Sequence, residues 1–92
     1  MGKVAMRVFY DGRVQGVGFR ATVRWIAEGF EITGWIKNLP DGRVELLVRG
    51  ESREVRDFLA AIRESELASH IKSALEEPTS IEMGQRGFSI TA

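Results

Sequence analysis

A chain of 92 residues, 43% hydrophobic and 28% charged, has the size and composition of one small globular domain, and we expect residues 1–92 to form it. The chain contains no cysteine, which excludes disulfides and thiolate chemistry, and no apolar run approaches the ~18 residues that span a membrane. Its 13 basic and 13 acidic residues cancel, so the broad positive charge typical of nucleic-acid-binding proteins is absent. We therefore expect a cytoplasmic protein that binds neither nucleic acid nor membrane.

The first half of the chain predicts a strand, a helix and a hairpin. Apolar residues occupy every second position of residues 4–10, which predicts a strand. Apolar residues spaced 4, 3, 1 and 3 apart over residues 19–30 predict an amphipathic helix. Residues 32–39 and 43–49 have the pattern of two further strands. Between them, Leu39-Pro40-Asp41-Gly42 places proline and glycine where a type I turn prefers them, so the two strands should form a hairpin.

The second half of the chain predicts a helix and two weaker strands. The helix begins at Glu51 or Ser52, and its apolar stripe is Val55, Phe58, Leu59 and Ile62. Residues 70–77 have a weak strand pattern, residues 78–87 are typical of a loop, and residues 88–91 form a short final strand. The order β-α-β-β-α-β predicts an α+β, ferredoxin-like (split βαβ) fold, with two helices on one face of an antiparallel sheet.

Residues 12–20, Gly-Arg-Val-Gln-Gly-Val-Gly-Phe-Arg, join the first strand to the first helix. The plainest interpretation is a tight turn, because glycine adopts positive φ angles easily. A second interpretation is an anion site, in which loop amides, the helix N-terminus and Arg20 converge on a phosphate. The spacing of Gly16, Gly18 and Ala21 formally matches the dinucleotide fingerprint. The predicted hairpin argues against it, and so does the end of the second strand, which is Lys37-Asn38 where that fold needs an acidic residue for the ribose. No Gly-Lys-Ser/Thr follows, which argues against a Walker loop.

A second cluster, Gly-Trp-Ile-Lys-Asn-Leu-Pro-Asp-Gly-Arg-Val-Glu at residues 34–45, places Asn38 at the end of a predicted strand. An asparagine there commonly caps a turn, but its amide can also hold a water molecule. Together, the stretches 12–20 and 34–45 in this element order strongly resemble the acylphosphatase family. The resemblance is sharp for residues 6–49 and loose afterwards. Ala21 departs from the family, which often has a larger residue after the arginine.

The resemblance implies hydrolysis of small-molecule acyl phosphates to a carboxylate and inorganic phosphate, with phosphate as product and inhibitor. Arg20 would bind the phosphoryl group, and Asn38 would orient the attacking water. We expect no cofactor, no metal ion and a monomer. The remaining phosphate contacts implied by the resemblance are backbone amides of the loop, at Gln15, Gly16, Val17, Gly18 and Phe19.

Two interpretations outside hydrolysis remain. The same scaffold could form a non-catalytic module that binds phosphate or carbamoyl phosphate. An RNA-recognition module shares the element order, but residues 43–49 lack the aromatic side chains that such a module needs. The single histidine, His70, has the position of a surface or structural residue rather than a nucleophile.

Overall fold

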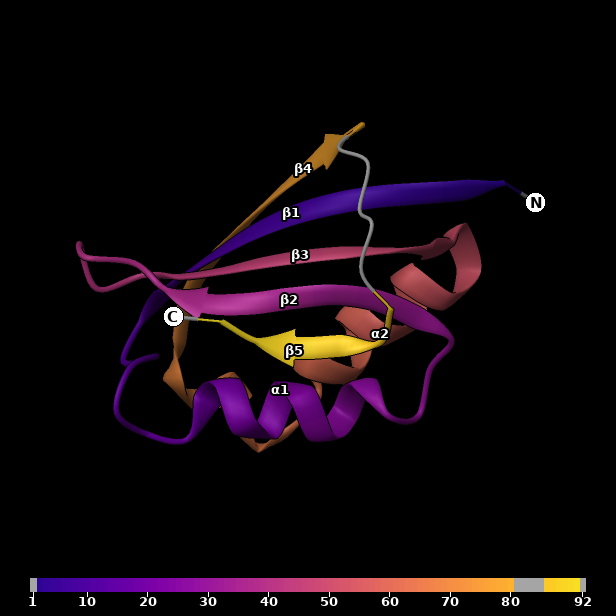
Figure 1. The fold of residues 1–92 in the computed structure, drawn as a ribbon. Coiled ribbons are helices and arrows are strands. Elements are labelled where there is room, and N and C mark those ends of the chain that lie inside the picture. Colours follow the sequence, from indigo (N-terminus) through magenta and orange to yellow (C-terminus); the bar gives the residue numbers. More distant parts are fainter. Residues whose placement is uncertain (1, 81–85, 92) are drawn as a thin grey trace.

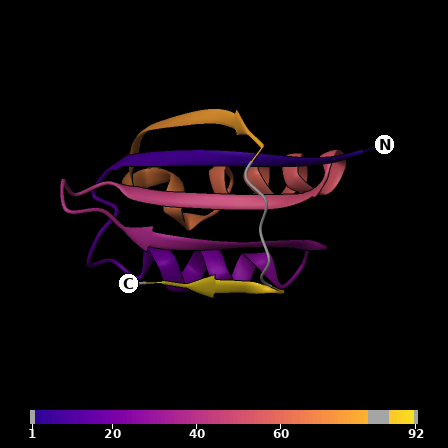
Figure 2. The same ribbon diagram turned by 45° about the horizontal axis from the view of Figure 1, so that its top comes forward.

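The computed structural model describes residues 2–80 and 86–91. In this part of the chain, two α-helices lie on one face of a five-stranded sheet with the strand order β4-β1-β3-β2-β5 (Figures 1 and 2). In chain order the elements are β1 (Lys3–Gly12), α1 (Phe19–Ala27), β2 (Ile32–Asn38), β3 (Val44–Glu51), α2 (Ser52–Arg63), the short 3-10 helix η1 (Glu66–His70), β4 (Ile71–Thr79) and β5 (Phe88–Ile90).

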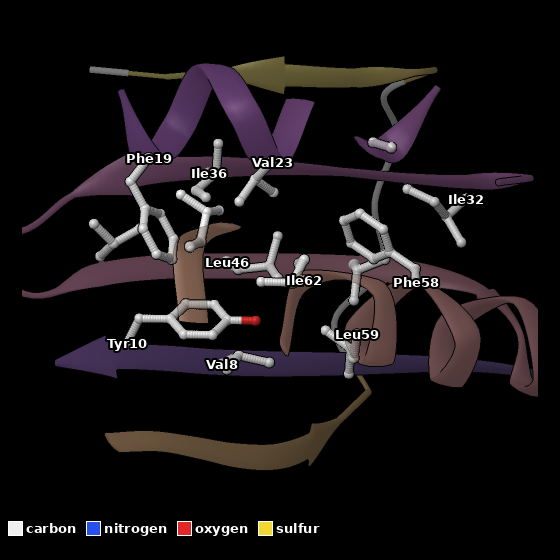
Figure 3. Close-up of a cluster of buried hydrophobic side chains, with 14 of the residues drawn as sticks. Val8, Tyr10, Phe19, Val23, Ile32, Ile36, Leu46, Phe58, Leu59 and Ile62 are labelled. Atoms are coloured by element: carbon white, nitrogen blue, oxygen red, sulfur yellow. The ribbon is translucent and has the colours of Figure 1, made fainter. Parts of the chain in front are cut away.

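The hydrophobic core lies between the sheet and the two helices, as the apolar patterns predict. Alternate residues of the central strands face the helices, because successive side chains of a strand point to opposite faces. The helical stripes of α1 and α2 cover them. Figure 3 shows these side chains meeting in one layer. Core residues from five elements include Val8, Tyr10, Phe19, Val23, Ile36, Leu46, Phe58 and Ile62.

The predicted split βαβ arrangement is confirmed, with one addition at the sheet edge. The pairings of β1 with β3, β1 with β4 and β2 with β3 are antiparallel. Strand β5, however, runs parallel to β2, with Phe88 opposite Gly34, so the sheet is mixed. The predicted turn is also confirmed, because the Gly42 amide donates to the Leu39 carbonyl at 3.1 Å.

Two boundaries after α2 differ from the prediction. Residues 66–70 form the helix η1, so His70 precedes β4 instead of opening it. Strand β4 also continues through Pro78, which the sequence pattern assigned to a loop. A proline fits here because β4 is an edge strand, where the missing N–H interrupts no second ladder. The remainder of the predicted loop at residues 81–85 lies outside the described residues.

Candidate active site

Strand register brings the two sequence clusters to the same end of the sheet. Val44, the first residue of β3, pairs with Tyr10 on one side and with Asn38 on the other. The loop that leaves β1 and the end of β2 therefore lie near each other, although about two dozen residues separate them in the sequence. Helix α1 starts at the same end of the sheet (Figure 1).

The loop between β1 and α1 has the conformation of an anion cradle, and we call residues 15–20 the cradle. Gly16 and Gly18 have φ angles of 79° and 76°, in the left-handed region that favours glycine. Gly18 is the N-cap of α1, and no side chain caps this helix. Among the described residues, the amides of residues 15–21 donate no backbone hydrogen bond. These donors and the positive end of the α1 dipole are thus available to an anion.

A pocket of about 180 Å³ contains both predicted catalytic side chains. Arg20 lies on the first turn of α1, and Asn38 lies on the last residue of β2. Arg20 forms no ion pair with another described residue, and it is the one charged side chain among the described residues that line the pocket. The pocket therefore favours an anionic ligand. The lining residues are Val14, Gly16, Gly18, Phe19, Arg20, Ala21, Asn38 and Ile90.

The side-chain oxygen of Asn38 is the second notable feature of this pocket. Asn38 Oδ1 is shielded from solvent, yet it has no hydrogen-bond partner among the described residues. Burying an unpaired polar atom costs roughly 1–3 kcal/mol, so native proteins tolerate few such atoms. An unpaired acceptor that shares a pocket with an arginine is well placed to bind a hydrogen-bond donor such as water.

The side chain of Gln15 has a role that the sequence prediction missed. The prediction counted Gln15 only for its backbone amide. In the structure, Gln15 Nε2 donates to the carbonyl oxygens of Leu39 and Arg43, at 2.9 Å each. These two carbonyls flank the turn that joins β2 to β3, directly after Asn38. Gln15 therefore fastens the cradle to the hairpin that holds Asn38. Neither Gln15 nor the exposed Val17 is among the pocket-lining residues.

A buried aromatic pair supports the start of α1. The rings of Tyr10 and Phe19 lie 5.2 Å apart between centroids, and both side chains are almost fully buried (Figure 3). Burial raises the pKa of the Tyr10 hydroxyl far above its ordinary value, so the group stays neutral. Phe19 immediately precedes Arg20 in the sequence. Its burial in the core therefore fixes where the arginine leaves the helix.

Within residues 2–80 and 86–91, no three His, Cys, Asp or Glu side chains gather as metal ligands would. In the same part of the chain, no helix has both the length and the apolar character needed to cross a membrane.

In the turn after β2, the Asp41 carboxylate accepts hydrogen bonds from the Arg43 amide at 3.1 Å and from Arg43 Nε at 2.8 Å. These bonds lower the pKa of Asp41 and brace the hairpin.

Comparison with known proteins identifies the family. The acylphosphatase family model matches residues 6–90. The acylphosphatase of Bacillus velezensis is 41% identical over 81 residues, which cover 88% of this chain and 90% of that protein. The crystal structure of the Bacillus subtilis acylphosphatase superposes with a TM-score of 0.86 at 35% identity, covering 97% of this chain and 99% of that one. An acylphosphatase from Coxiella burnetii gives 0.84 at 31% identity, covering 97% and 93%. This chain therefore belongs to the acylphosphatase family.

Proposed function

We propose that this chain hydrolyses the carboxyl-phosphate anhydride of acyl phosphates to a carboxylate and inorganic phosphate. One observation carries the proposal. An arginine and an amide oxygen, neither of which has a partner among the described residues, share one small pocket at the N-terminus of a helix. The family resemblance and the names of the relatives support the same reaction.

The cradle would bind the phosphoryl group. Arg20 offers a planar, permanently charged guanidinium that matches two phosphate oxygens. The amides of residues 15–20, which donate no hydrogen bond to the backbone of the described residues, offer further donors, and the dipole of α1 favours the negative charge. A loose phosphoryl-transfer transition state needs mainly positioning and charge stabilisation, which these groups supply.

Asn38 would hold the attacking water. Its Oδ1, which has no partner among the described residues, would accept a hydrogen bond from water and so orient the water oxygen toward phosphorus. As the new oxygen–phosphorus bond forms, the phosphorus–oxygen bond to the acyl group breaks, and its electron pair leaves on the carboxylate. The proton of the water passes to a phosphate oxygen, because the amide of Asn38 is no base near neutral pH. Carboxylic acids have pKa values near ~4, so this leaving group needs no protonation.

The test separates phosphate binding from turnover. With benzoyl phosphate as substrate, Arg20→Gln should weaken inhibition by inorganic phosphate and lower kcat/KM by about 10²–10³-fold, as for the loss of an oxyanion donor. Asn38→Ala should lower kcat by a similar factor and leave the inhibition constant of phosphate nearly unchanged. A chelator should not affect the wild-type rate.

Arg24→Gln is the matched control. Arg24 is an exposed arginine of α1 outside the cradle pocket, so its variant should retain full activity. Full activity of the Arg20 or Asn38 variant would refute the assigned roles. Tight phosphate binding without turnover in the wild type would instead identify a non-catalytic phosphate-binding module.

We also propose that one chain suffices for the reaction, because a single protomer supplies the arginine, the asparagine and the loop amides. A cytoplasmic monomer stays the prediction from the sequence. Sedimentation of the active protein at assay concentration tests the oligomeric state.

A further inference from the structure

A second hollow adjoins the cradle pocket along helix α1. Its volume is about 290 Å³, larger than the roughly 180 Å³ of the cradle pocket. Ala21 is the one described residue that lines both hollows. The second hollow runs between α1 and the segment after α2, and its lining residues are Ala21, Thr22, Trp25, Ile26, Ser65 and Glu66.

Helix geometry places the second hollow one turn from the phosphate site. Residues four apart on a helix are neighbours, with Cβ atoms about 5–6 Å apart, so Trp25 follows Ala21 on the same side of α1. The side chain of Ala21 is a single methyl group, so it adds little bulk between the two hollows. A group attached to a phosphate in the cradle would extend over Ala21 to reach Trp25.

Trp25 is unusual among the aromatic residues of this chain. Its side chain is 72% exposed, whereas Phe19 and Phe58 are almost fully buried. An exposed indole offers a broad apolar face that folding leaves unused, and aromatic faces attract planar and apolar groups. The exposed indole lines a hollow that shares Ala21 with the cradle pocket.

We propose that this second hollow is the acyl-binding subsite, and that it favours apolar acyl groups, above all planar aromatic ones. The inference rests on the proposed hydrolase function and extends it to substrate preference. The phosphoryl group lies in the cradle, the anhydride oxygen passes over Ala21, and the acyl group packs on Trp25. Glu66 is the one charged side chain among the described lining residues, and it forms no ion pair with another described residue. Its carboxylate disfavours acyl groups that carry a second negative charge.

The experiment compares three substrates that differ only in the acyl group: benzoyl phosphate, acetyl phosphate and succinyl phosphate. For the wild type, kcat/KM should fall in this order. Trp25→Ala should lower the ratio of benzoyl to acetyl kcat/KM by about three- to tenfold, the value of one aromatic contact. Trp25→Phe keeps an aromatic ring and should restore most of that ratio.

Ala21→Leu tests the passage independently of the indole. A branched side chain at residue 21 narrows the route over the helix, so the benzoyl rate should fall more than the acetyl rate. Inhibition by inorganic phosphate, which does not enter the second hollow, should change little in the Trp25 variants. Leu75→Ala is the matched surface control, since Leu75 is an exposed apolar residue of β4 outside both hollows.

The outcomes separate the two proposals. Equal losses for benzoyl and acetyl phosphate in the Trp25 and Ala21 variants, or no loss for either, would overturn the acyl subsite while leaving the hydrolase function intact. A wild type that hydrolyses none of the three substrates would overturn both. Because Trp25 is exposed, its variants should fold, and circular dichroism checks this.

Discussion

The two hydrogen bonds from Gln15 to the hairpin make the most direct test of how this fold positions its site. Gln15 Nε2 donates to Leu39 O and Arg43 O, both at 2.9 Å, across 24 and 28 residues of sequence. Gln15→Met is the informative change, because methionine has a similar length and volume but no donor. It removes both bonds and leaves the surrounding packing nearly intact.

The expected loss of stability in Gln15→Met depends on whether the two carbonyl oxygens keep another hydrogen-bond donor. Leu39 O still accepts from the Gly42 amide at 3.1 Å, and Arg43 O still accepts from the Leu39 amide at 2.8 Å. Neither oxygen is left unpaired, so each lost bond costs only its net contribution of about 0.5–1.5 kcal/mol. The free energy of unfolding should therefore fall by about 1–3 kcal/mol. Catalysis should fall further, because a misplacement of about 1 Å between cradle and water can cost up to 10²-fold.

Urea unfolding and steady-state kinetics with benzoyl phosphate measure the two effects. We expect kcat to fall at least tenfold, with a change of less than about threefold in the phosphate inhibition constant, because Arg20 and the loop amides remain. Gln15→Glu provides a second readout. Its carboxylate cannot donate to the carbonyls at neutral pH, but the protonated acid can, so its relative kcat should recover as the pH falls toward the acid's pKa. Wild-type stability and kcat in Gln15→Met would refute the positioning role.

Two further predictions concern the hairpin. Gly34 has a φ angle of 155°, and a Cβ there would overlap the backbone carbonyl of Leu47, so Gly34→Ala should lower the free energy of unfolding by about 2–4 kcal/mol. Gly29→Ala meets only ordinary contacts and should be nearly neutral in the same urea titration. Asp41 has a folded-state pKa below its ordinary value of 3.8, because the Arg43 amide and guanidinium bond its carboxylate. The stabilisation that the ionised Asp41 carboxylate gives the folded state is therefore complete above the ordinary pKa of 3.8. It is lost as the pH falls through the folded-state pKa. The stability difference between wild type and Asp41→Asn should shrink correspondingly on acidification, and a constant difference down to pH 2 would contradict this.

The elements that the sequence predicts well are those with one strongly buried face. The alternation in β1 and the stripe of α2 report directly on burial, so their positions follow from the pattern. Strand β4 is exposed along nearly its whole length, and only residues at its two ends are half-buried. An edge strand without a buried face leaves no clear period, so neither its end at Thr79 nor the helix η1 could be located.

The candidate site likewise has features that the sequence predicts and features that only the fold creates. Arg20 and Asn38 are predicted from local motifs, and the structure brings them together in one pocket. The side-chain role of Gln15 depends on two carbonyls of a distant hairpin, and nothing in the neighbouring sequence records that contact. The second hollow depends on how the segment after α2 packs against α1, which no periodicity encodes. The small size of Ala21 is visible in the sequence, but its consequence appears only once both hollows are seen.

The parallel pairing of β5 with β2 has a practical consequence for handling the protein. Parallel strands run toward the same end of a sheet. The last residue of β5, Ile90, therefore pairs with Ile36, two residues before Asn38, and it lines the cradle pocket. Lys3, the first residue of β1, instead pairs with Glu51, at the opposite end of the sheet. Figure 1 shows the start of β1 and the end of β5 on opposite sides of the molecule. A purification tag or fusion partner attached after Thr91 would begin next to the cradle pocket, which Ile90 lines. The same tag attached ahead of Gly2 would begin far from that pocket, and immobilisation through that end should leave the pocket open to substrate.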